Sequence, residues 1–390
     1  MAGCLRCGVP ALLLFALMTS AVRAAPGASA GPPPYTFRLL AERHLRSLDA
    51  LPDMDADGYG ELAWGVSYGM MALNVLYEAT GDTRFLARQA DLVERVLGKR
   101  DSNLAAAHGS EAYVDYQRGR VLRSWGTSHY SAGRHTCWLV HAGMLLYPMA
   151  EYVRLVQAGG DRTRPWLDRA RRVVPAVEET IAEFDAEWRD GPQPGQGYYV
   201  FPSGDLAPNN QMNAPGRALF VLADVTGKTE YRDRARKLAA YFRSKLTHVA
   251  DGDYYIWAYS QQTPDGPPGR GEDVSHAAIN AHFAYVAWEH GASFTDTDMA
   301  RLARTLTHGL YLGGGEMAAT LGGREPNDDY TGQCGRWGFL ARFDPLVETA
   351  IRDYIASHPR SGALSGTTGA LGYAYLLRAR GLRGAVAATR

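Results

Sequence analysis

The feature that most constrains the fold is a repeated alternation of two kinds of helix along the chain. One kind is apolar nearly all round, as in residues 61–79, and the next is amphipathic, as in residues 83–97. A helix that is apolar all round must be enclosed by protein, whereas an amphipathic helix presents one face to water. The alternation therefore predicts an all-α protein with an inner layer of helices surrounded by an outer layer.

The same alternation recurs to the end of the chain. Further inner helices are expected at 135–156, 213–225, 273–289 and 335–341, and their outer partners at 164–188, 229–246, 295–311 and 345–357. Segment 369–378 is an inner helix with no outer partner after it, and the amphipathic segment 35–48 could supply that partner. Repeated helical pairs predict an array or a toroid. We favour an (α/α)6-type toroid over an open solenoid, because the inner helices lack polar faces.

The connections between these helices differ in length. Those from inner to outer helices are about three to eight residues long, which is ordinary for helical hairpins. The connections from outer to inner helices are long, at 99–133, 189–208, 247–271 and 312–334. Long loops commonly carry function, and in an alternating ring they all emerge at one end. That end, where the inner helices begin, is the expected mouth.

The N-terminus has the composition of a secretory signal. Arg6 precedes an apolar run at 10–18, and small residues follow up to a plausible cleavage site after Ala24. The run is too short to cross a bilayer. We therefore expect a signal peptide at 1–24, a linker at 25–34 and a single toroid domain at 35–390. The mature protein would be secreted or periplasmic, with no membrane insertion after cleavage.

The composition narrows the class of partner. The chain has 41 basic and 41 acidic residues and no basic run, which argues against nucleic acid. Its 22 Tyr and 8 Trp suit a surface that stacks on sugar rings. A poly- or oligosaccharide is therefore the expected substrate. Whether Cys137 and Cys334 form a disulfide stays open.

Polar and aromatic side chains gather where the inner helices are expected to begin. A structural explanation exists for single members, since Asp273 could be a simple N-cap. Five helices with polar groups at the same end are harder to explain that way, because an unsatisfied buried group costs about 1–3 kcal/mol. The candidate substrate-binding residues are Trp64, Tyr68, His135, Trp138, Asn209, Asn210, Asn213, Arg217, Trp257 and Arg336. The candidate catalytic residues are Tyr255, Tyr259, Glu272, Asp273 and His276.

A resemblance rests on three of these features. The helical hairpins, the turn Ala79-Thr80-Gly81-Asp82, and the Tyr-rich loop leading into Glu272-Asp273-Val274-Ser275-His276-Ala277 resemble the six-hairpin (α/α) toroid enzymes. This superfamily contains polysaccharide lyases, inverting glycoside hydrolases and sugar epimerases. The resemblance covers most of residues 35–380 and singles out no family. It implies the toroid fold and an activity on carbohydrate.

The first functional hypothesis is a lyase that cleaves a uronate-containing glycan by β-elimination. That reaction needs a base, an acid, and donors that stabilise the substrate carboxylate as charge develops. His276 and either Tyr259 or Tyr255 could serve as base and acid. The donors available for the carboxylate are Asn209, Asn210 and Arg217.

The alternatives use other parts of the same mouth. An inverting hydrolase needs two carboxyl groups roughly 6.5–9.5 Å apart, and the sequence marks out no such pair among Glu61, Glu272, Asp273, Asp328 and Asp329. Some toroid hydrolases have a glutamate four residues before the tyrosine of the first inner helix, where this chain has Trp64. A uronyl epimerase or a non-catalytic glycan-binding protein also fits. No cofactor is expected, and no metal, because ligand spacing such as His-x-x-x-His does not occur.

Overall fold

The computed structural model describes residues 34–48, 58–266, 269–326, 328–358 and 366–388. All of them lie in one unit, Pro34–Arg390. The signal peptide expected at 1–24 and the linker at 25–34 lie outside the described residues, except for Pro34. They therefore stay predictions.

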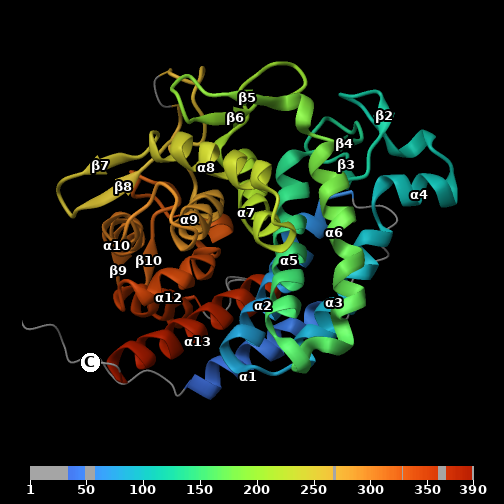
Figure 1. The fold of residues 1–390 in the computed structure, drawn as a ribbon. Helices are drawn as coiled ribbons and strands as arrows, with labels where there is room; N and C mark the ends of the chain where they lie inside the picture. The colour runs from blue at the N-terminus through green and yellow to red at the C-terminus, as the bar shows by residue number, and fades with distance from the viewer. Residues whose placement is uncertain (1–33, 49–57, 267–268, 327, 359–365, 389–390) are drawn as a thin grey trace, which may run out of the picture. The chain divides into compact units, whose positions relative to one another are not determined.

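The inner helices form a closed ring, as the alternation predicts (Figure 1). Each inner element contacts the next along the chain, and the last one returns to the first. The inner elements are the π-helical turn η3 (Leu62–Val66) with α2 (Ser67–Thr80), α5 (Leu139–Ala158), α7 (Asn209–Thr226), α9 (Val274–Glu289), the 3-10 helix η8 (Cys334–Arg342) and α13 (Gly366–Ala388). The (α/α)6-type toroid is confirmed.

An outer helix packs against each inner element. The outer elements are α3 (Arg84–Gly98), α6 (Leu167–Ala182), α8 (Thr229–Arg243), α10 (Asp296–Arg304) with the π-helix η7 (Thr305–Leu310), α12 (Leu346–Ser357) and α1 (Pro34–Leu45). The N-terminal helix α1 packs on α13. The two ends of the unit therefore complete the last helical pair, as the unpaired segment 369–378 suggested.

Two of the hairpin turns share one hydrogen-bonding scheme. Gly81 and Gly227 follow α2 and α7 with φ of 68° and 74°, a left-handed conformation that favours glycine. Before each glycine, a threonine hydroxyl donates to the carbonyl four residues back at 2.6 Å and accepts from the amide two residues on at 3.2 Å. The repeated Thr-Gly sequence thus ends both helices in the same way.

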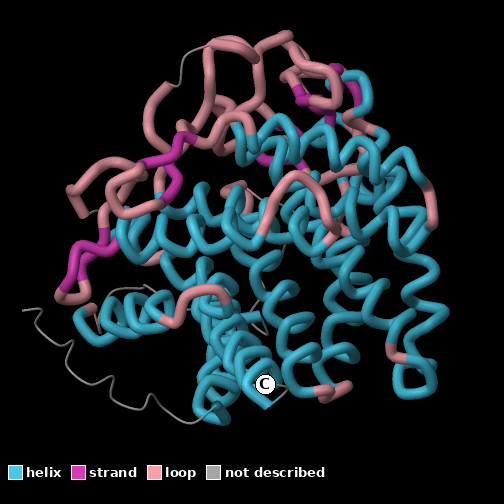
Figure 2. The backbone as a smooth tube through the Cα atoms, turned by 60° about the vertical axis from the view of Figure 1, so that its left-hand side comes forward, coloured by secondary structure: helices cyan, strands magenta, loops and turns pink. Residues whose placement is uncertain are grey.

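The long loops contain short antiparallel hairpins and short helices that helical periodicity does not reveal (Figure 2). The hairpins are β1 (Val114–Asp115) with β2 (Arg120–Val121), β3 (Gly126–Thr127) with β4 (Thr136–Cys137), β5 (Trp188–Asp190) with β6 (Gly197–Tyr199), β7 (Thr247–Val249) with β8 (Tyr254–Ile256), and β9 (Tyr311–Gly313) with β10 (Glu316–Met317). The short helices are η1 (Arg46–Leu48), α4 (Asp101–His108), η4 (Glu111–Tyr113), η5 (Gly160–Trp166), η6 (Asp185–Glu187) and α11 (Asp328–Thr331).

One hairpin corrects the expected start of the second inner helix. Residues 135–137 are not helical, because Thr136 and Cys137 pair with Thr127 and Gly126 across the β3–β4 hairpin. Helix α5 begins only at Leu139. The apolar run was therefore assigned to the right helix, but its N-terminal end was placed four residues too early.

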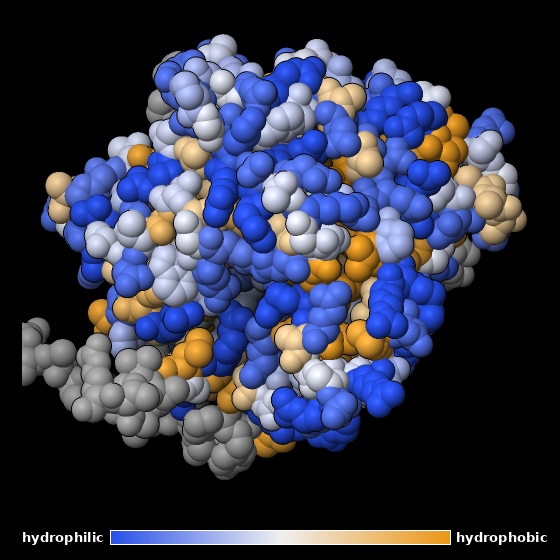
Figure 3. Space-filling view, viewed as in Figure 1, coloured by the Kyte–Doolittle hydropathy of each residue, from blue (hydrophilic) through white to orange (hydrophobic). Residues whose placement is uncertain are grey.

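The face drawn in Figure 3 is mostly polar, with apolar side chains in small scattered groups. Among the described residues, no helix combines the length and the apolar character needed to span a bilayer. Cys137 and Cys334 are both buried and unbridged.

The packing of α1 into the ring can be tested on one helix. Phe37 is 1% exposed, whereas Leu39 is 57% exposed on the opposite side of the same helix. Replacing Phe37 with alanine should lower the free energy of unfolding by about 3–5 kcal/mol through the lost contacts and the cavity left behind. Leu39→Ala should change it by less than about 0.5 kcal/mol. Urea unfolding of both variants is the measurement, and equal effects would contradict the position of α1 against α13.

Candidate active site

Two adjoining pockets form a cleft where the inner helices begin. The first, the Asn210 pocket, has a volume of about 490 Å³, and the second, the Arg336 pocket, about 510 Å³. Trp64, Tyr130 and His276 line both pockets, so these three residues lie at the junction. The Asn210 pocket is further lined by Gln117, Trp138, Val140, His141, Phe201, Ser203, Asp205, Pro208, Asn210, Gln211 and Tyr259. The Arg336 pocket adds Tyr59, Glu61, Gly65, Ser275, Asp329, Tyr330, Gln333 and Arg336.

The starts of the inner elements position the polar groups of this cleft. Asn210 is the second residue of α7. His276 is the third residue of α9, and Arg336 is the third residue of η8. Trp138 is the N-cap of α5, and Trp64 lies in the π-helical turn before α2. π-helical turns are rare and frequently occur at functional sites.

Asp273 and His276 form a dyad at the start of α9. The Asp273 side chain caps the helix by accepting from the amides of Ser275 and His276 at 3.0 and 3.1 Å. Its other oxygen accepts from Nδ1 of His276. Burial opposes ionisation of Asp273, but the hydrogen bonds from His276 and Ser275 lower its pKa to about 2. Because Nδ1–H of His276 donates to this carboxylate, the neutral form of the imidazole has its lone pair on Nε2.

Tyr259 lies beside this dyad. Its ring centre is 5.7 Å from that of His276, and its backbone carbonyl accepts from the Asn209 amide at 3.0 Å. Burial, with the negative charges of Glu272 and Asp273, raises the pKa of the Tyr259 phenol to about 12. Tyr259 therefore carries its proton at neutral pH, whereas Asp273 is ionised.

Glu272 is fully buried beneath the cleft and does not line it. Its carboxyl accepts from the Asn280 amide at 2.8 Å, and Asn280 in turn accepts from Asn213 at 2.8 Å. Burial raises the pKa of Glu272 well above its usual range, and the neighbouring charge of Asp273 adds to the shift. The hydrogen bond between Asn280 and Asn213 therefore links α9 to α7, and Glu272 lies at the end of this chain of side chains.

Arg336 brings a positive charge to the cleft. Its guanidinium lies 3.8 Å from the ring centre of Tyr68, and one nitrogen donates to Thr368 at 3.2 Å. Burial lowers the pKa of Arg336, although a guanidinium stays charged at neutral pH. Within the described part of the chain, no carboxylate lies within ion-pair distance of it. An anionic ligand would supply the missing partner.

Buried polar atoms without a hydrogen-bond partner among the described residues gather at the same place. They include the indole nitrogens of Trp64 and Trp138, the side-chain oxygens of Asn210 and Gln333, and Nε of Arg336. Each such atom costs about 1–3 kcal/mol if it stays unsatisfied. Trp64, Tyr130 and Trp138 line the same cleft and provide faces on which a sugar ring can stack.

Several residues expected at the mouth lie elsewhere. The Tyr255 hydroxyl donates to Asp298 at 2.6 Å on α10, and Trp257 is buried against Trp337, so neither lines the cleft. His135 lines a separate cavity of about 290 Å³. Four more are buried below the cleft without lining it, namely Tyr68, Asn209, Asn213 and Arg217.

The structure adds cleft residues that the candidate set omitted. Tyr130 reaches both pockets from the loop between β3 and β4, and Asp205 and Gln333 come from loop positions without periodic signal. His141 lines the Asn210 pocket, and desolvation lowers its pKa to about 3, so its ring is neutral. Tyr130 lies in the long connection 99–133, where no pattern distinguishes it from the other tyrosines of the loops.

The closed ring of inner helices with its outer layer defines an (α/α)6 toroid, the fold of several carbohydrate-active enzymes. Among solved structures, the α-1,6-mannanase GH76A from Salegentibacter sp. HEL1_6 is similar. An inactive variant of it in complex with α-1,6-mannotriose matches with a TM-score of 0.56 and 12% identity, over 89% of this chain and 99% of that chain. The mannanase itself matches with a TM-score of 0.54 over the same shares at 12% identity. At this identity the likeness concerns the fold alone.

No protein-family model matches the chain, and no curated protein matches it.

The dyad makes a prediction about stability and pH. Because the pKa of Asp273 falls from 3.8 to about 2 on folding, its ionised form stabilises the native state by about 2 kcal/mol above the unfolded pKa. This contribution is lost as the pH falls towards the folded pKa, and about half of it should remain at about pH 3. Asp273→Asn should therefore be less stable than the wild type near neutral pH, and the gap should narrow in acid. Urea unfolding near neutral pH and at about pH 3 is the measurement, and a gap independent of pH would contradict the stabilisation of the Asp273 carboxylate by its hydrogen bonds.

Proposed function

We propose that this protein is a polysaccharide lyase that cleaves a uronate-containing glycan by β-elimination. The observation that carries the proposal is the position of His276 at the junction of two pockets, with protonated Tyr259 in one and Arg336, which has no carboxylate partner among the described residues, in the other. β-Elimination uses a base, an acid and a cation in one site, and this cleft offers one residue for each role.

In the proposed reaction, Nε2 of His276 takes the proton from C5 of the uronate, next to the carboxylate. The electron pair forms the C4=C5 double bond while the C4–O glycosidic bond breaks. The leaving oxygen takes the proton of the Tyr259 hydroxyl. The roles follow from the hydrogen bonds and the phenol, because the bond from Nδ1 of His276 to Asp273 directs Nε2 towards the cleft as an acceptor and the phenol of Tyr259 has a pKa of about 12. A phenol with that pKa donates a proton more readily than it abstracts one.

Arg336 would hold the uronate carboxylate in its pocket. A guanidinium without a protein counter-ion suits a carboxylate ligand, and charge on the carboxylate grows as the proton leaves. A neighbouring sugar would occupy the Asn210 pocket, between Trp138 and Tyr259. The glycan chain would then cross the cleft at His276.

The second candidate is an inverting glycoside hydrolase. Its support is the presence of Glu61, Asp205 and Asp329 in the lining of the cleft, and the structurally similar mannanase is named for activity on an α-1,6-linked mannan. The lyase is favoured because an inverting hydrolase needs a protonated carboxyl at the leaving oxygen. The carboxyl group near the dyad whose pKa is strongly raised belongs to Glu272. Because Glu272 is buried and does not line the cleft, it could not reach the leaving oxygen of a substrate bound there.

A panel of anionic polysaccharides distinguishes these reactions. The lyase predicts a rise in ultraviolet absorbance from the unsaturated uronate, in step with new reducing ends. Reducing ends without absorbance would favour the hydrolase and overturn the proposal. The absence of both signals would also overturn the proposal, and it would favour a uronyl epimerase or a glycan-binding protein. Export through the signal predicted at 1–24 would bring such an enzyme to an extracellular polymer.

Two matched pairs of variants test the assigned groups. His276→Gln and Tyr259→Phe should each lower kcat by about 10²–10⁴-fold, the usual contribution of a positioned acid or base. His290→Gln, at the other end of α9, and Tyr254→Phe, in β8, change the same residue types outside the cleft and should leave kcat within about twofold of the wild type. Initial rates of absorbance change give the values. An unchanged kcat in either cleft variant would remove that residue from the reaction.

The role of Arg336 predicts a dependence on substrate charge. Arg336→Ala should lower kcat/KM on the acidic glycan by about 10–100-fold, since a hydrogen bond to a charged group contributes about 1.5–3 kcal/mol. Binding of the same glycan with its carboxyl groups reduced to alcohols should be weak in the wild type and unaffected by the substitution. Calorimetric titration of both glycans checks this, and equal losses on the two would contradict carboxylate recognition.

A further inference from the structure

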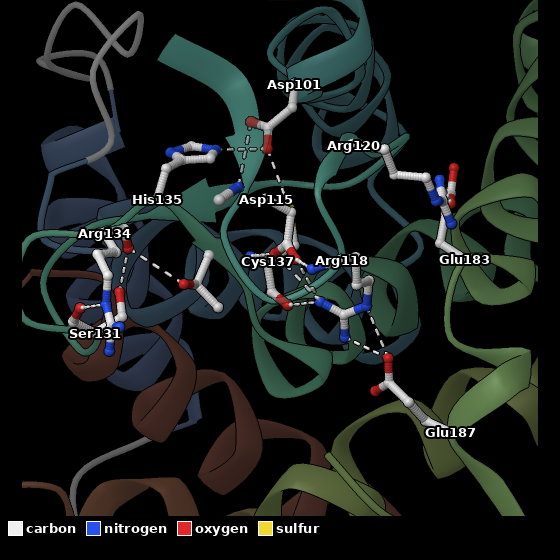
Figure 4. A network of polar contacts seen from close by, with 12 residues as sticks. Asp101, Asp115, Arg118, Arg120, Ser131, Arg134, His135, Cys137, Glu183 and Glu187 are labelled. Carbon is white, nitrogen blue, oxygen red and sulfur yellow. Dashed lines mark hydrogen bonds and ion pairs between the residues drawn. The ribbon is translucent and has the colours of Figure 1, made fainter. Parts of the chain in front are cut away.

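A second cluster of chemically reactive side chains lies in the first long loop, apart from the cleft. Oδ2 of Asp101 is 2.7 Å from Nε2 of His135 and 3.1 Å from Sγ of Cys137 (Figure 4). These three atoms lie within 4.8 Å of one another. Asp101 and His135 also line the cavity of about 290 Å³, which Tyr113 and Trp125 help to enclose. None of the three residues lines the cleft.

The surrounding backbone holds the cluster in place. The Asp101 amide donates to the Ser124 carbonyl at 2.7 Å, and the Gly126 amide donates to Oδ1 of Asp101 at 3.3 Å. A Cβ added to Gly126 would lie 2.1 Å from Nε2 of His135. Glycine at this position therefore leaves the space that the imidazole occupies next to Asp101.

The charge balance of the cluster is incomplete. Asp101 has a side chain that is 3% exposed, and within the described part of the chain its ion-pair partner is His135, with no arginine or lysine. The nearby Asp115 contrasts with it, because it pairs with Arg118, which also pairs with Glu187 (Figure 4). Buried carboxylates are normally paired with a cation or bind a metal. Among the described residues, Asp115 therefore has a permanent cation as its partner, whereas Asp101 contacts an imidazole, a thiol and the Gly126 amide.

We propose that Asp101, His135 and Cys137 bind a divalent cation of the zinc class. Carboxylate oxygen, imidazole nitrogen and thiolate sulfur are the ligand types that Zn²⁺ prefers, and three protein ligands leave a fourth position for water. Tetrahedral ligands at about 2.0–2.3 Å from zinc are about 3.3–3.8 Å apart. The distances from Oδ2 of Asp101 to the other two ligand atoms, 2.7 and 3.1 Å, would therefore each lengthen by less than about 1 Å. On binding, Cys137 releases its thiol proton to solvent, His135 changes to the tautomer with its proton on Nδ1 so that Nε2 is free to ligate, and the metal replaces the hydrogen bonds to Oδ2.

The position of the site suggests a structural role. Cys137 immediately precedes Trp138, and the loop between β3 and β4 carries Tyr130, so both ligands from this hairpin adjoin residues that line the cleft. Asp101 begins α4 at the other end of the same long connection. The cation would tie the two ends of this connection together and hold Trp138 and Tyr130 in position.

Metal binding is tested on the full-length chain with Zn²⁺ and Co²⁺ as probes. After loading and removal of free metal, elemental analysis should give one Zn²⁺ per chain. Co²⁺ should give a thiolate-to-cobalt charge-transfer band in the near ultraviolet, together with the visible bands of a tetrahedral ion. Zn²⁺ should also raise Tm. A chain that takes up no stoichiometric metal would overturn the proposal and leave Asp101 as a hydrogen-bond acceptor only.

The two buried cysteines provide a matched control. Cys137→Ser should lose the charge-transfer band, whereas Cys334→Ser should keep it. His135→Gln, at a partly exposed position, should weaken Co²⁺ binding by at least about tenfold without loss of fold. Circular dichroism of each variant checks folding. A band that persists in Cys137→Ser, or Co²⁺ affinity unchanged in His135→Gln, would contradict the assigned ligands.

Discussion

Enclosure of the inner helices is the constraint on which the rest of the structure depends. Helix α7, for example, packs against α5, α9 and the outer helix α8, so little of its surface meets water. A polar side chain on the flank of such a helix would lose its hydration without compensation. Polar groups therefore gather at the N-terminal ends, where the long loops meet the ring and where amide groups have no partner within the helix. The cleft follows from how the ring is built.

Asp273 shows how a helix start becomes a chemical site. One carboxylate caps α9, fixes the imidazole of His276 and places a negative charge beside Glu272 and Tyr259. That charge adds to the burial that raises the pKa of both neighbours, while the hydrogen bonds keep Asp273 itself ionised. The dyad therefore sets which group accepts a proton and which donates one. Under the proposed mechanism, the direction of proton transfer depends on this one helix cap.

Helical periodicity was enough to predict the ring, including α1 as the partner of α13. A helix that is enclosed on every side is apolar on every face, and this pattern is visible within the segment itself. It could not predict which residues near the helix starts face the cleft. Tyr255 and Tyr259 are four residues apart in one aromatic segment, yet the β7–β8 hairpin turns Tyr255 towards α10. Tyr259 lies beyond β8, which ends at Ile256, so the strand pairing that directs Tyr255 does not set the orientation of Tyr259, and helical periodicity records neither. His135 was misplaced for a similar reason, since β4 delays the start of α5.

The central claim is that a glycan crosses the cleft between the Arg336 and Asn210 pockets, with His276 at the bond that breaks. A crystal structure of His276→Gln with an acidic oligosaccharide bound is the most direct measurement. The account predicts a uronate carboxylate on the guanidinium of Arg336, the adjoining sugar in the Asn210 pocket, and the glycosidic oxygen facing the Tyr259 hydroxyl. An oligosaccharide bound outside the cleft, or bound within it with its carboxylate turned away from Arg336, would contradict the account.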